Sequence, residues 1–535
     1  MRAPSPLPSA TGPSARSRWW ALPAAAVCLA LVAGCSLFPD GGGGDEPDGG
    51  GGDEQGETAD PVTTRAVNGW VLDEAEAEVE LHRVDDEHMV ATLEVTNHGD
   101  YGPLWTHLVD DHGTHQPGYE ETFLWDYFSG LSWLDPDGSQ LHKPFHLPDR
   151  SCLCSHEDDD DGAQRGHISE GDTYSLYTVL AAPPEGVEEL TLYSHFSLPF
   201  VDVPVNEGAP EGLDYTAPAD EPEAEPDTAE LETVVDSPDE TTVAGQEQTE
   251  MHLASDVLFD VDESELTEEA EQVLERAAEQ IDTADPGQVA LDGHTDSSGD
   301  DSINDPLSQD RAENVQEALE GMVSVDVDFT ADGHGSSDPI ADNDSEDGKA
   351  RNRRVTATMP VTLPAPQEQA EDESGGDGDG GQEQGRPVED FDPVASPEGD
   401  FEVTLTELRH VSPGVALLAY RVDADEGAED AVDPEFAFSY DRWLEMRHRG
   451  VYAVWLTDPG SERISSTLRV HPVGGGGDPW CACSPASGAN LGSERMEAGE
   501  SRDFFALMPV PGEQGAAVDV SIGELEDFEG VAITP

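Results

Sequence analysis

Apolar positions between residues 250 and 362 follow two different periods. A helical period runs from Leu266 to Ile281, and a second, shorter helical series contains Ala312, Val315 and Leu319. Short apolar or alternating runs predict strands near 257–259, 289–291, 325–329 and 355–359. The resulting order, β-α-β-α-β-β, predicts an α/β sandwich with helices on one face of a small mixed sheet.

The chain on either side of this part has a different pattern. Alternating apolar and polar residues begin each side, at Ala77–Leu81 and at Phe401–Leu405. Further apolar runs follow at Val90–Val95 and Val415–Tyr420, separated from their neighbours by Gly, Pro and Asp. Short strands with such turns are typical of antiparallel β-sandwiches of about 130 residues.

The two sides also share local motifs, which indicates that one is a copy of the other. Trp133–Ser139 matches Trp455–Ser461, and the Cys-x-Cys-Ser segment at 152–155 matches the one at 481–484. Because the copies lie far apart in the chain, they indicate a duplication rather than a solenoid of short repeats. We therefore expect two related all-β sandwich domains flanking the central module.

Acidic, Gly-rich and Pro-rich stretches separate these parts. They occur at 35–65, 206–249 and 363–397, contain few apolar side chains, and are predicted to be disordered linkers. The predicted domains are consequently 66–205 for the first sandwich, 250–362 for the central module and 398–535 for the second sandwich.

Residues 1–34 resemble a targeting segment. Arg2, Arg16 and Arg18 precede an apolar stretch, Trp19–Ala33, that is too short to span a membrane as a helix. The stretch ends in Val-Ala-Gly-Cys35, which resembles the cleavage box of bacterial lipoproteins and predicts lipidation of Cys35. The alternative is an ordinary signal peptide followed by an incidental cysteine.

The negative charge of the chain makes some classes of binding partner unfavourable. It has 24 basic and 117 acidic residues and a net charge of −93, so nucleic acids and anionic lipid surfaces are not expected to bind. Residues 250–362 contain six basic side chains, and five of them, Arg311, Lys349, Arg351, Arg353 and Arg354, lie in or beside two short motifs. Such clustering in an acidic module indicates a binding site.

Those motifs belong to a series of three blocks. The first runs Gly-His-Thr-Asp296-Ser-Ser-Gly, the second Asn304-Asp-Pro-Leu-Ser-Gln-Asp-Arg311-Ala, and the third Asn-Arg353-Arg. We expect Asp296 to follow a strand, and Ser308 to cap a helix that carries Arg311 in its first turn, where free N–H groups favour anions. A carboxylate and a guanidinium held close together form a clamp for a zwitterion, such as the free amino-acid end of diaminopimelate in a peptidoglycan stem peptide.

The three blocks resemble, in order and spacing, the pattern of the OmpA-like peptidoglycan-binding domain family. The resemblance implies that Asp296 and Arg311 recognise the ammonium and carboxylate of diaminopimelate. It also assigns further residues to the site: Asp260, Ser298, Asn304, Leu307 and Arg353. It implies binding rather than catalysis and requires no cofactor or metal. In the alternative, Arg311 and Arg353 merely neutralise Asp296 and Asp260.

The Cys-x-Cys pairs suggest other chemistry. Outside the cytoplasm, we expect disulfides within each pair, Cys152–Cys154 and Cys481–Cys483, although pairing between the two copies is also possible. A metal site at Cys152, Cys154 and His156 is less favoured, because the second copy has no matching histidine. His294 and His334 have no adjacent nucleophile in the motifs and are interpreted as structural.

The sequence as a whole predicts an exported lipoprotein of the cell envelope, anchored by lipid on Cys35 to the outer membrane or to the outer face of the cell membrane. Its central module would bind peptidoglycan non-covalently. In the alternative, the sandwiches bind an extracellular ligand or partner while the module only localises them, and a weaker variant gives the Cys-x-Cys pairs a redox role.

Overall fold

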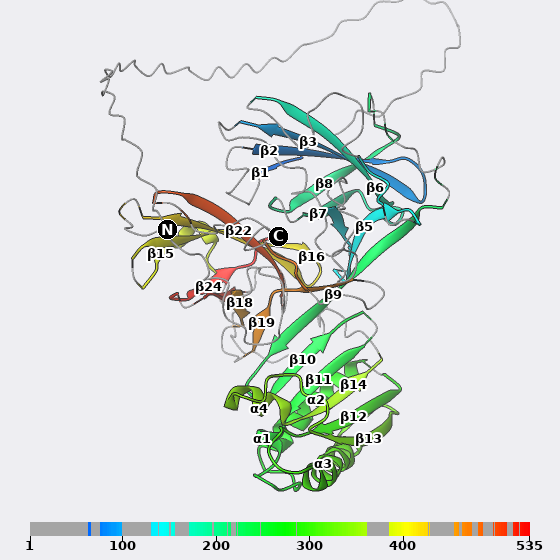
Figure 1. Cartoon of the computed structure of the whole chain (residues 1–535), viewed down its shortest axis with the longest axis vertical. Helices are drawn as coiled ribbons and strands as arrows, with labels where there is room; N and C mark the ends of the chain where they lie inside the picture. Colours follow the sequence, from blue (N-terminus) through cyan, green and yellow to red (C-terminus); the bar gives the residue numbers. More distant parts are fainter. Residues whose placement is uncertain are drawn as a thin grey trace, which may run out of the picture. The chain divides into compact units, whose positions relative to one another are not determined.

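The computed structural model (Figure 1) describes residues 62–65, 75–98, 130–155, 171–360, 385–427 and 454–535. Short gaps interrupt these ranges at 137, 149–150, 195–196, 211, 214, 216–220, 222, 247, 285, 398, 426, 459–462, 473–479, 485–495, 497, 511–516 and 524. The predicted leader 1–34, Cys35 and the linker up to residue 61 lie outside the described residues. Within the described part, no helix has the length and apolar character needed to cross a membrane.

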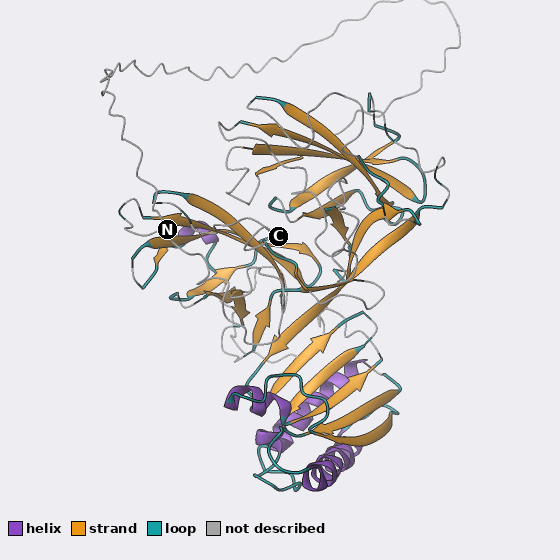
Figure 2. Cartoon of the chain, viewed as in Figure 1, coloured by secondary structure: helices purple, strands orange, loops and turns teal. Residues whose placement is uncertain are grey.

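The central module contains the predicted β-α-β-α-β-β order, with two additional short helices. Its elements are β11 (Thr249–Ala254), α1 (Ser255–Leu258), α2 (Ala270–Ala284), β12 (Gln288–His294), α3 (Asp301–Met322), β13 (Asp328–Gly335), α4 (Glu346–Asn352) and β14 (Arg354–Met359). The strands form the order β11-β14-β12-β13, in which β12 and β13 are parallel and the other pairs antiparallel. Helices α2 and α3 lie against this sheet (Figure 2).

One apolar core joins the helices to the sheet. It is built from alternate strand residues, including Met251, Leu291 and Val355, and from helix residues such as Val273 and Val315. These five side chains are at most 1% exposed. The apolar residues at helical spacing and those at strand spacing therefore pack against each other in one core.

The first strand of the module was predicted in the wrong place. Residues 257–259 are not a strand: α1 forms one helical turn, and the N–H of Phe259 donates to the carbonyl of Ser255 at 2.9 Å. The strand is β11, which alternates buried Met251 and Leu253 with half-buried His252. A three-residue apolar run cannot by itself distinguish a strand from a buried helical turn.

Strands make up most of the described residues of the flanking regions. The N-terminal β region contains β1 (Val62–Arg65), β2 (Ala75–Arg83), β3 (His88–Asn97), β4 (Leu131–Leu134), β5 (Gln140–His146), β6 (Thr173–Ala181), β7 (Glu189–Ser194) and β8 (Phe200–Glu207). The C-terminal β region contains β15 (Val394–Ala395), β16 (Phe401–Ser412), β17 (Val415–Ala424), β18 (Val454–Thr457), β19 (Ile464–Ser466), β20 (Arg469–Pro472), β21 (Trp480–Cys481), β22 (Ser501–Pro509), β23 (Ala517–Ile522) and β24 (Phe528–Ala532).

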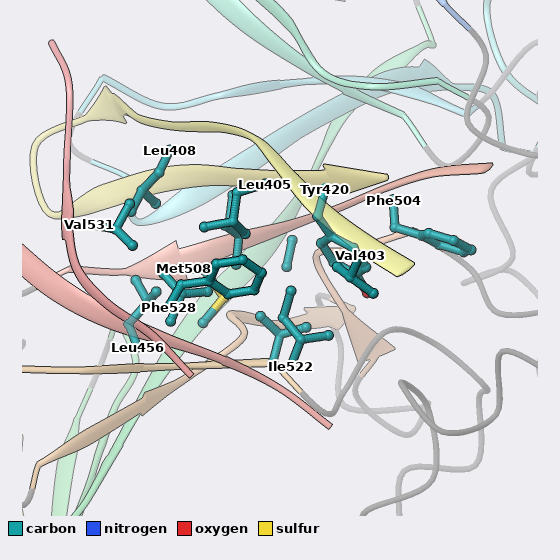
Figure 3. Packing of buried hydrophobic residues seen from close by; sticks show 14 of the residues in the cluster. Val403, Leu405, Leu408, Tyr420, Leu456, Phe504, Met508, Ile522, Phe528 and Val531 are labelled. Carbon is teal, nitrogen blue, oxygen red and sulfur yellow. The ribbon is translucent and has the colours of Figure 1, made fainter. Parts of the chain in front are cut away.

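The C-terminal β region encloses a core between its strands (Figure 3). Leu405 of β16 and Met508 of β22 belong to a four-stranded sheet, whereas Leu456 of β18 and Ile522 of β23 belong to strands paired outside that sheet. Phe528 of β24 completes the same cluster. The short helix η4 (Val388–Asp390) and β15 also pack here, so the last part of the predicted linker 363–397 belongs to this region.

Backbone contacts at the Cys-x-Cys-Ser segments support the predicted duplication. In the N-terminal region, Ser155 donates its N–H to the carbonyl of Tyr177, and its Oγ accepts the N–H of Tyr177 at 2.8 Å. In the C-terminal region, Ser484 and Phe505 form the same two contacts, with an Oγ–N distance of 2.8 Å. Each segment is thus inserted beside a strand in the same way.

The cysteines within each segment are joined in the structure. The bonded pairs are Cys152–Cys154 and Cys481–Cys483, with Cα–Cα distances of 5.3 and 5.2 Å. All four side chains are at most 6% exposed. His156, the third member of the less favoured metal site, lies outside the described residues.

The segment 206–249, predicted to be a disordered linker, instead contributes two strands to the sheets. It contains the long strand β9 (Glu225–Asp236) and the strand β10 (Glu240–Ala244), which continues the central sheet beyond β11. β9 pairs with β5 of the N-terminal region and with β19 and β20 of the C-terminal region. A single strand therefore contacts all three parts of the chain.

Acidic residues along β9 are matched by cations from both flanking regions. Lys143 Nζ lies 3.4 Å from Asp227, and Arg469 Nη1 donates to Glu232 at 3.0 Å. Between these contacts, Ala229 and Leu231 are buried in a cluster with residues of both flanking regions. The few apolar residues of 206–249 lie among many acidic ones, and for this reason the composition of the segment predicted a disordered linker.

We expect β9 to resist proteolysis in the native chain. A Glu-specific protease should cleave at Glu230 and Glu232 only under conditions that unfold the protein, because both residues lie in paired strand. Leu231→Ala should remove about 2–5 kcal/mol of stability and accelerate this cleavage, which mass spectrometry of timed digests would measure. Cleavage of the native wild-type chain at these sites as fast as in urea would contradict the strand assignment.

We also expect the disulfides to lie within each segment. Mass spectrometry of a digest prepared without reduction should find the peptides with Cys152–Cys154 and with Cys481–Cys483 each two hydrogens lighter than their reduced forms. A covalent dimer of the two peptides would instead support pairing between the copies.

Candidate functional site

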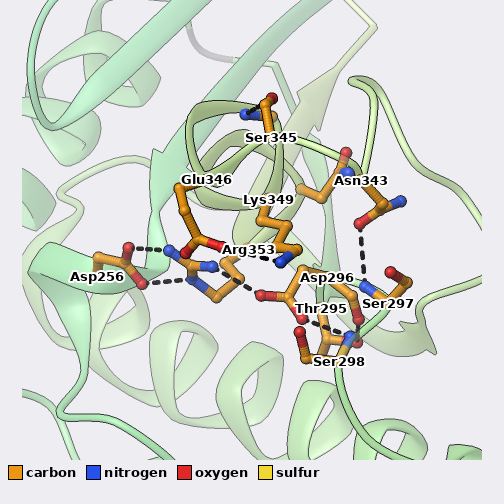
Figure 4. Close-up of polar contacts among 12 residues, drawn as sticks. Asp256, Thr295, Asp296, Ser297, Ser298, Asn343, Ser345, Glu346, Lys349 and Arg353 are labelled. Atoms are coloured by element: carbon orange, nitrogen blue, oxygen red, sulfur yellow. Dashed lines mark hydrogen bonds and ion pairs between the residues drawn. The ribbon is translucent and has the colours of Figure 1, made fainter.

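The three motif blocks come together in the central module: Asn304 of the second block contacts the loop of the first, and Arg353 of the third contacts Asp296, a contact drawn in Figure 4. Asp296 lies in the loop after β12, Arg311 lies on α3, and Arg353 lies between α4 and β14. Residues far apart in the sequence therefore supply neighbouring side chains, as in the 2.6 Å contact between Arg353 and Asp296, which are 57 residues apart. The site forms only when the chain folds, because no single motif contains all of its residues.

The approach of α3 to the sheet requires glycine at two positions, of which Gly293 lies in the first motif block and Gly333 lies on β13. A Cβ atom at Gly293 would overlap the backbone of Ser308, and one at Gly333 would overlap the backbone of Gln309. Both glycines lie on adjacent parallel strands, and the Oγ of Ser308 accepts the N–H of Gly335 at 2.9 Å. The glycine of Gly-His-Thr-Asp thus allows the helix that carries Arg311 to pack closely beside Asp296.

Asp296 is 7% exposed, and each of its carboxylate oxygens accepts one hydrogen bond. Its Oδ1 accepts the N–H of Ser298 at 2.7 Å, and its Oδ2 accepts Nη1 of Arg353 at 2.6 Å. Burial alone would raise the pKa of Asp296, but the hydrogen bonds from Arg353 and Ser298 outweigh it and lower the pKa below its usual value. Asp296 is consequently an anion at neutral pH.

Arg353 bridges two carboxylates. Besides Asp296, it binds Asp256 of α1 through a fork, with Nε–Oδ1 at 2.8 Å and Nη2–Oδ2 at 2.5 Å. The hydrogen bond to Asp256 is the main reason that the pKa of Arg353 is raised. The predicted neutralisation of Asp296 by an arginine is therefore present, but Arg353 and not Arg311 provides it.

Arg311 is buried and forms no ion pair with any described residue. It is 5% exposed, its Nε donates to the carbonyl of Glu263 at 3.0 Å, and its guanidinium lies 4.9 Å above the ring of Phe259. Among the described residues, no acceptor contacts its Nη1 or Nη2, and neither nitrogen is sealed from solvent. Burial lowers its pKa, which marks a cation that the protein itself does not fully compensate.

The predicted helix start was wrong. α3 begins at Asp301 with Asp300 as its N-cap, so Ser308 lies inside the helix and Arg311 lies well beyond the first turn. The free N–H groups at the helix start therefore do not flank Arg311. Pro306 is accommodated within the helix, and Asp300 and Asp301 supply acidic groups at its positive end.

The other residues assigned by resemblance have different positions. Asn304 is 4% exposed and supports the loop, since its Nδ2 donates to the carbonyls of Asp296 at 3.4 Å and Ser298 at 3.2 Å. Ser298 is exposed beside Asp296, and Leu307 is half-buried on α3. Asp260 is exposed and forms no side-chain hydrogen bond or ion pair in the described part, so it takes no part in the alternative ion-pair network, in which Arg353 instead binds Asp256 and Asp296.

Sequence reasoning missed three residues that shape the site. Asp256 precedes the recognised motifs and carries no spacing signal. Asn343 accepts the N–H of Ser297 at 3.0 Å through its Oδ1 and so supports the loop after β12. Asn352 is fully buried and accepts the N–H groups of Ile340 and Ala341 at 2.9 and 3.0 Å. Only Asn352 could have been found, because it opens the third motif block.

The two motif histidines have structural contacts. His294 and His334 stack with ring centroids 5.2 Å apart, and Nε2 of His334 lies 2.7 Å from Oδ1 of Asp292. Burial, assisted by Arg354 and His334, lowers the pKa of His294 to about 4, so this ring is neutral at physiological pH. Within the described residues, no group of three or more His, Cys, Asp or Glu side chains is arranged to hold a metal.

The family model described as "OmpA family" matches residues 258–353. Residues 258–353 belong to the OmpA family. The matched part contains Asp296, Arg311 and Arg353, and it excludes Asp256 and both flanking regions. The OmpA-like module is thus one part of a larger chain.

Curated relatives match the same part of the chain. The outer membrane protein Omp38 of Acinetobacter baumannii is 33% identical over 23% of this chain and 35% of its own length. The outer-membrane lipoprotein YfiB of Pseudomonas aeruginosa is 34% identical over 21% of this chain and 66% of its own length. The chain therefore spans about a third to two thirds of these relatives.

A solved structure, the cell wall anchor of the T6SS from Pseudomonas aeruginosa, is 31% identical over 22% of this chain and 82% of its own. Its TM-score of 0.20 is too low to support an argument about this chain.

We expect the charge of Asp296 to stabilise the OmpA-like module. Because its folded pKa lies below the unfolded value, this stabilisation is present above about pH 4 and is lost as the pH falls through the folded pKa. Asp296→Asn should lower the local unfolding free energy at pH 7 by roughly 1–3 kcal/mol, and this difference should shrink at acid pH as the pH falls through the folded pKa of Asp296. Hydrogen exchange of peptides from 288–359 in the full chain would measure it.

Asp332→Asn, which changes an exposed acid on β13, is the matched control and should alter stability little at either pH. A pH-independent effect of Asp296→Asn would mean that its charge does not contribute.

Proposed function

We propose that this chain binds peptidoglycan non-covalently through the OmpA-like module, which clamps the free amino-acid end of a diaminopimelate stem residue. The observation that carries the proposal is Arg311, a buried guanidinium whose terminal nitrogens lack a protein acceptor in the described part of the chain. A buried charge without a partner is costly, and a ligand carboxylate would offset that cost.

The two poles of the ligand would contact different groups. The carboxylate would accept two N–H groups from Nη1 and Nη2 of Arg311, each contributing roughly 1.5–3 kcal/mol. The ammonium would donate to Asp296, whose two oxygens each retain a lone pair after the contacts with Ser298 and Arg353. Asn304 and Asn343 would keep the loop after β12 in place before the ligand arrives.

Membership of residues 258–353 in the OmpA family supports a role in the cell envelope, and one relative is named an outer-membrane lipoprotein. We therefore include lipid attachment at Cys35 in the proposal. The lipid would hold one end of the chain at a membrane while the module holds the cell wall. Binding, and not catalysis, would be the activity.

A pull-down of the full-length chain on purified diaminopimelate-type peptidoglycan tests the clamp. Asp296→Ala and Arg311→Ala should each reduce binding by about tenfold or more, because each removes one pole of the site. Arg311→Lys should also bind poorly, since an ammonium cannot form the planar two-point contact. Asp332→Ala is the control and should bind like the wild type.

Failure of the folded wild-type chain to bind would overturn the proposal and direct attention to the duplicated β regions. Equal binding by the wild type and both site variants would contradict the clamp while leaving peptidoglycan binding intact.

A further inference from the structure

Asp256 gives the site one carboxylate more than the two-residue clamp requires. It lies on α1, before the residues that match the family model, and its side chain is about half exposed. Both of its oxygens bind Arg353. The N–H of Ser255 also donates to the carbonyl of Arg353 at 3.0 Å, so backbone and side chain hold α1 against the same arginine.

The charges around the site can be counted from these contacts. Asp256, Arg353 and Asp296 form a continuous triad, which carries one net negative charge. Lys349, the other cation near Asp296, is paired with Glu346 at 2.9 Å and adds no net charge. Arg311 forms no ion pair among the described residues and carries one positive charge, which the nearby charges of Asp256 and Asp262 partly offset.

Without Asp256, the net charge would change at the place proposed for the ligand ammonium. Arg353 and Asp296 alone form a neutral pair, so the place proposed for the ammonium would lose its net negative charge. Arg311 would still attract a carboxylate. Such a site would no longer distinguish strongly between a zwitterion and a plain anion, because only its anion-binding half would remain charged.

We propose that Asp256 is a specificity-determining residue, which offsets the charge of Arg353 so that the site prefers zwitterionic amino-acid heads to purely anionic ones. This inference rests on the proposed function of the module. Asp256 acts on the ligand through Arg353 and Asp296 and is not itself a contact of the ligand carboxylate.

Asp262 provides a matched control. It is an exposed acid in the loop after α1, close enough to act on the charge of Arg311, and it forms no hydrogen bond or ion pair with Arg353 among the described residues. Its backbone φ of 62° suits asparagine as well as aspartate. Asp262→Asn thus removes a charge near the carboxylate pole and leaves the triad unchanged.

The test compares two small ligands on the full-length chain. Meso-diaminopimelate carries an ammonium and a carboxylate at each end, whereas pimelate has the same carbon chain and only the carboxylates. Ligand-observed NMR, with displacement by soluble peptidoglycan fragments to identify the site, would give the ratio of the two affinities. The wild type should prefer diaminopimelate.

Asp256→Asn should reduce this ratio by about tenfold, because it removes a unit charge near the ammonium. Asp262→Asn should leave the ratio unchanged, since any gain at Arg311 applies to both ligands. Asp256→Glu retains the charge and should keep most of the preference. This last variant separates the role of charge from that of packing.

An unchanged ratio in Asp256→Asn, or equal weakening of both ligands, would overturn the specificity role while the proposed function stands. A wild-type chain that binds neither peptidoglycan nor diaminopimelate would refute the proposed function itself.

Discussion

The geometry of the site depends on the ion pairs that the guanidinium of Arg353 forms with Asp256 and Asp296. Arg353 joins α1 through Asp256 and the loop after β12 through Asp296, while its own backbone ends α4 and precedes β14. Three elements that are distant in sequence are thereby fixed relative to one another. The two ion pairs of Arg353 are only partly buried and therefore add little to the stability of the fold. Their main effect is to hold the three elements in place.

Outside the site, the small number of basic residues limits how many carboxylates can form ion pairs. With 24 basic and 117 acidic residues, most carboxylates have no basic side chain to pair with and must remain solvated. The chain has two lysines, and one of them, Lys143, lies buried against Asp227 of β9. Together with Arg469 and Glu232, this contact places cations from both β regions on one acidic strand. That strand lies among apolar side chains of both regions, which explains why so acidic a segment is ordered.

The sequence predicts those features that have a period or a fixed motif. The order of elements in the OmpA-like module, its core faces and the proximity of Asp296 to the third motif block follow from such patterns. β9 could not be predicted, because its buried Ala229, Leu231 and Val234 have no simple alternation and are outnumbered by acids. The start of α3 was missed because Ser308 and Asp300 are both residue types that commonly cap helices, and the sequence pattern does not distinguish between them. Asp256 was missed because its partner is supplied by an element 97 residues away.

The most informative cation in the module is the one without an acidic partner. In a chain where acids exceed bases almost fivefold, an arginine can find a carboxylate nearby with little constraint on the fold. Arg353 does so twice, whereas Arg311 is more deeply buried and, in the described part of the chain, contacts only a carbonyl and an aromatic ring. An ion pair inside the protein would be the simplest way to offset its desolvation. In the proposed function, the carboxylate of the ligand would supply this offset to Arg311, beside an Asp296 that is already paired with Arg353.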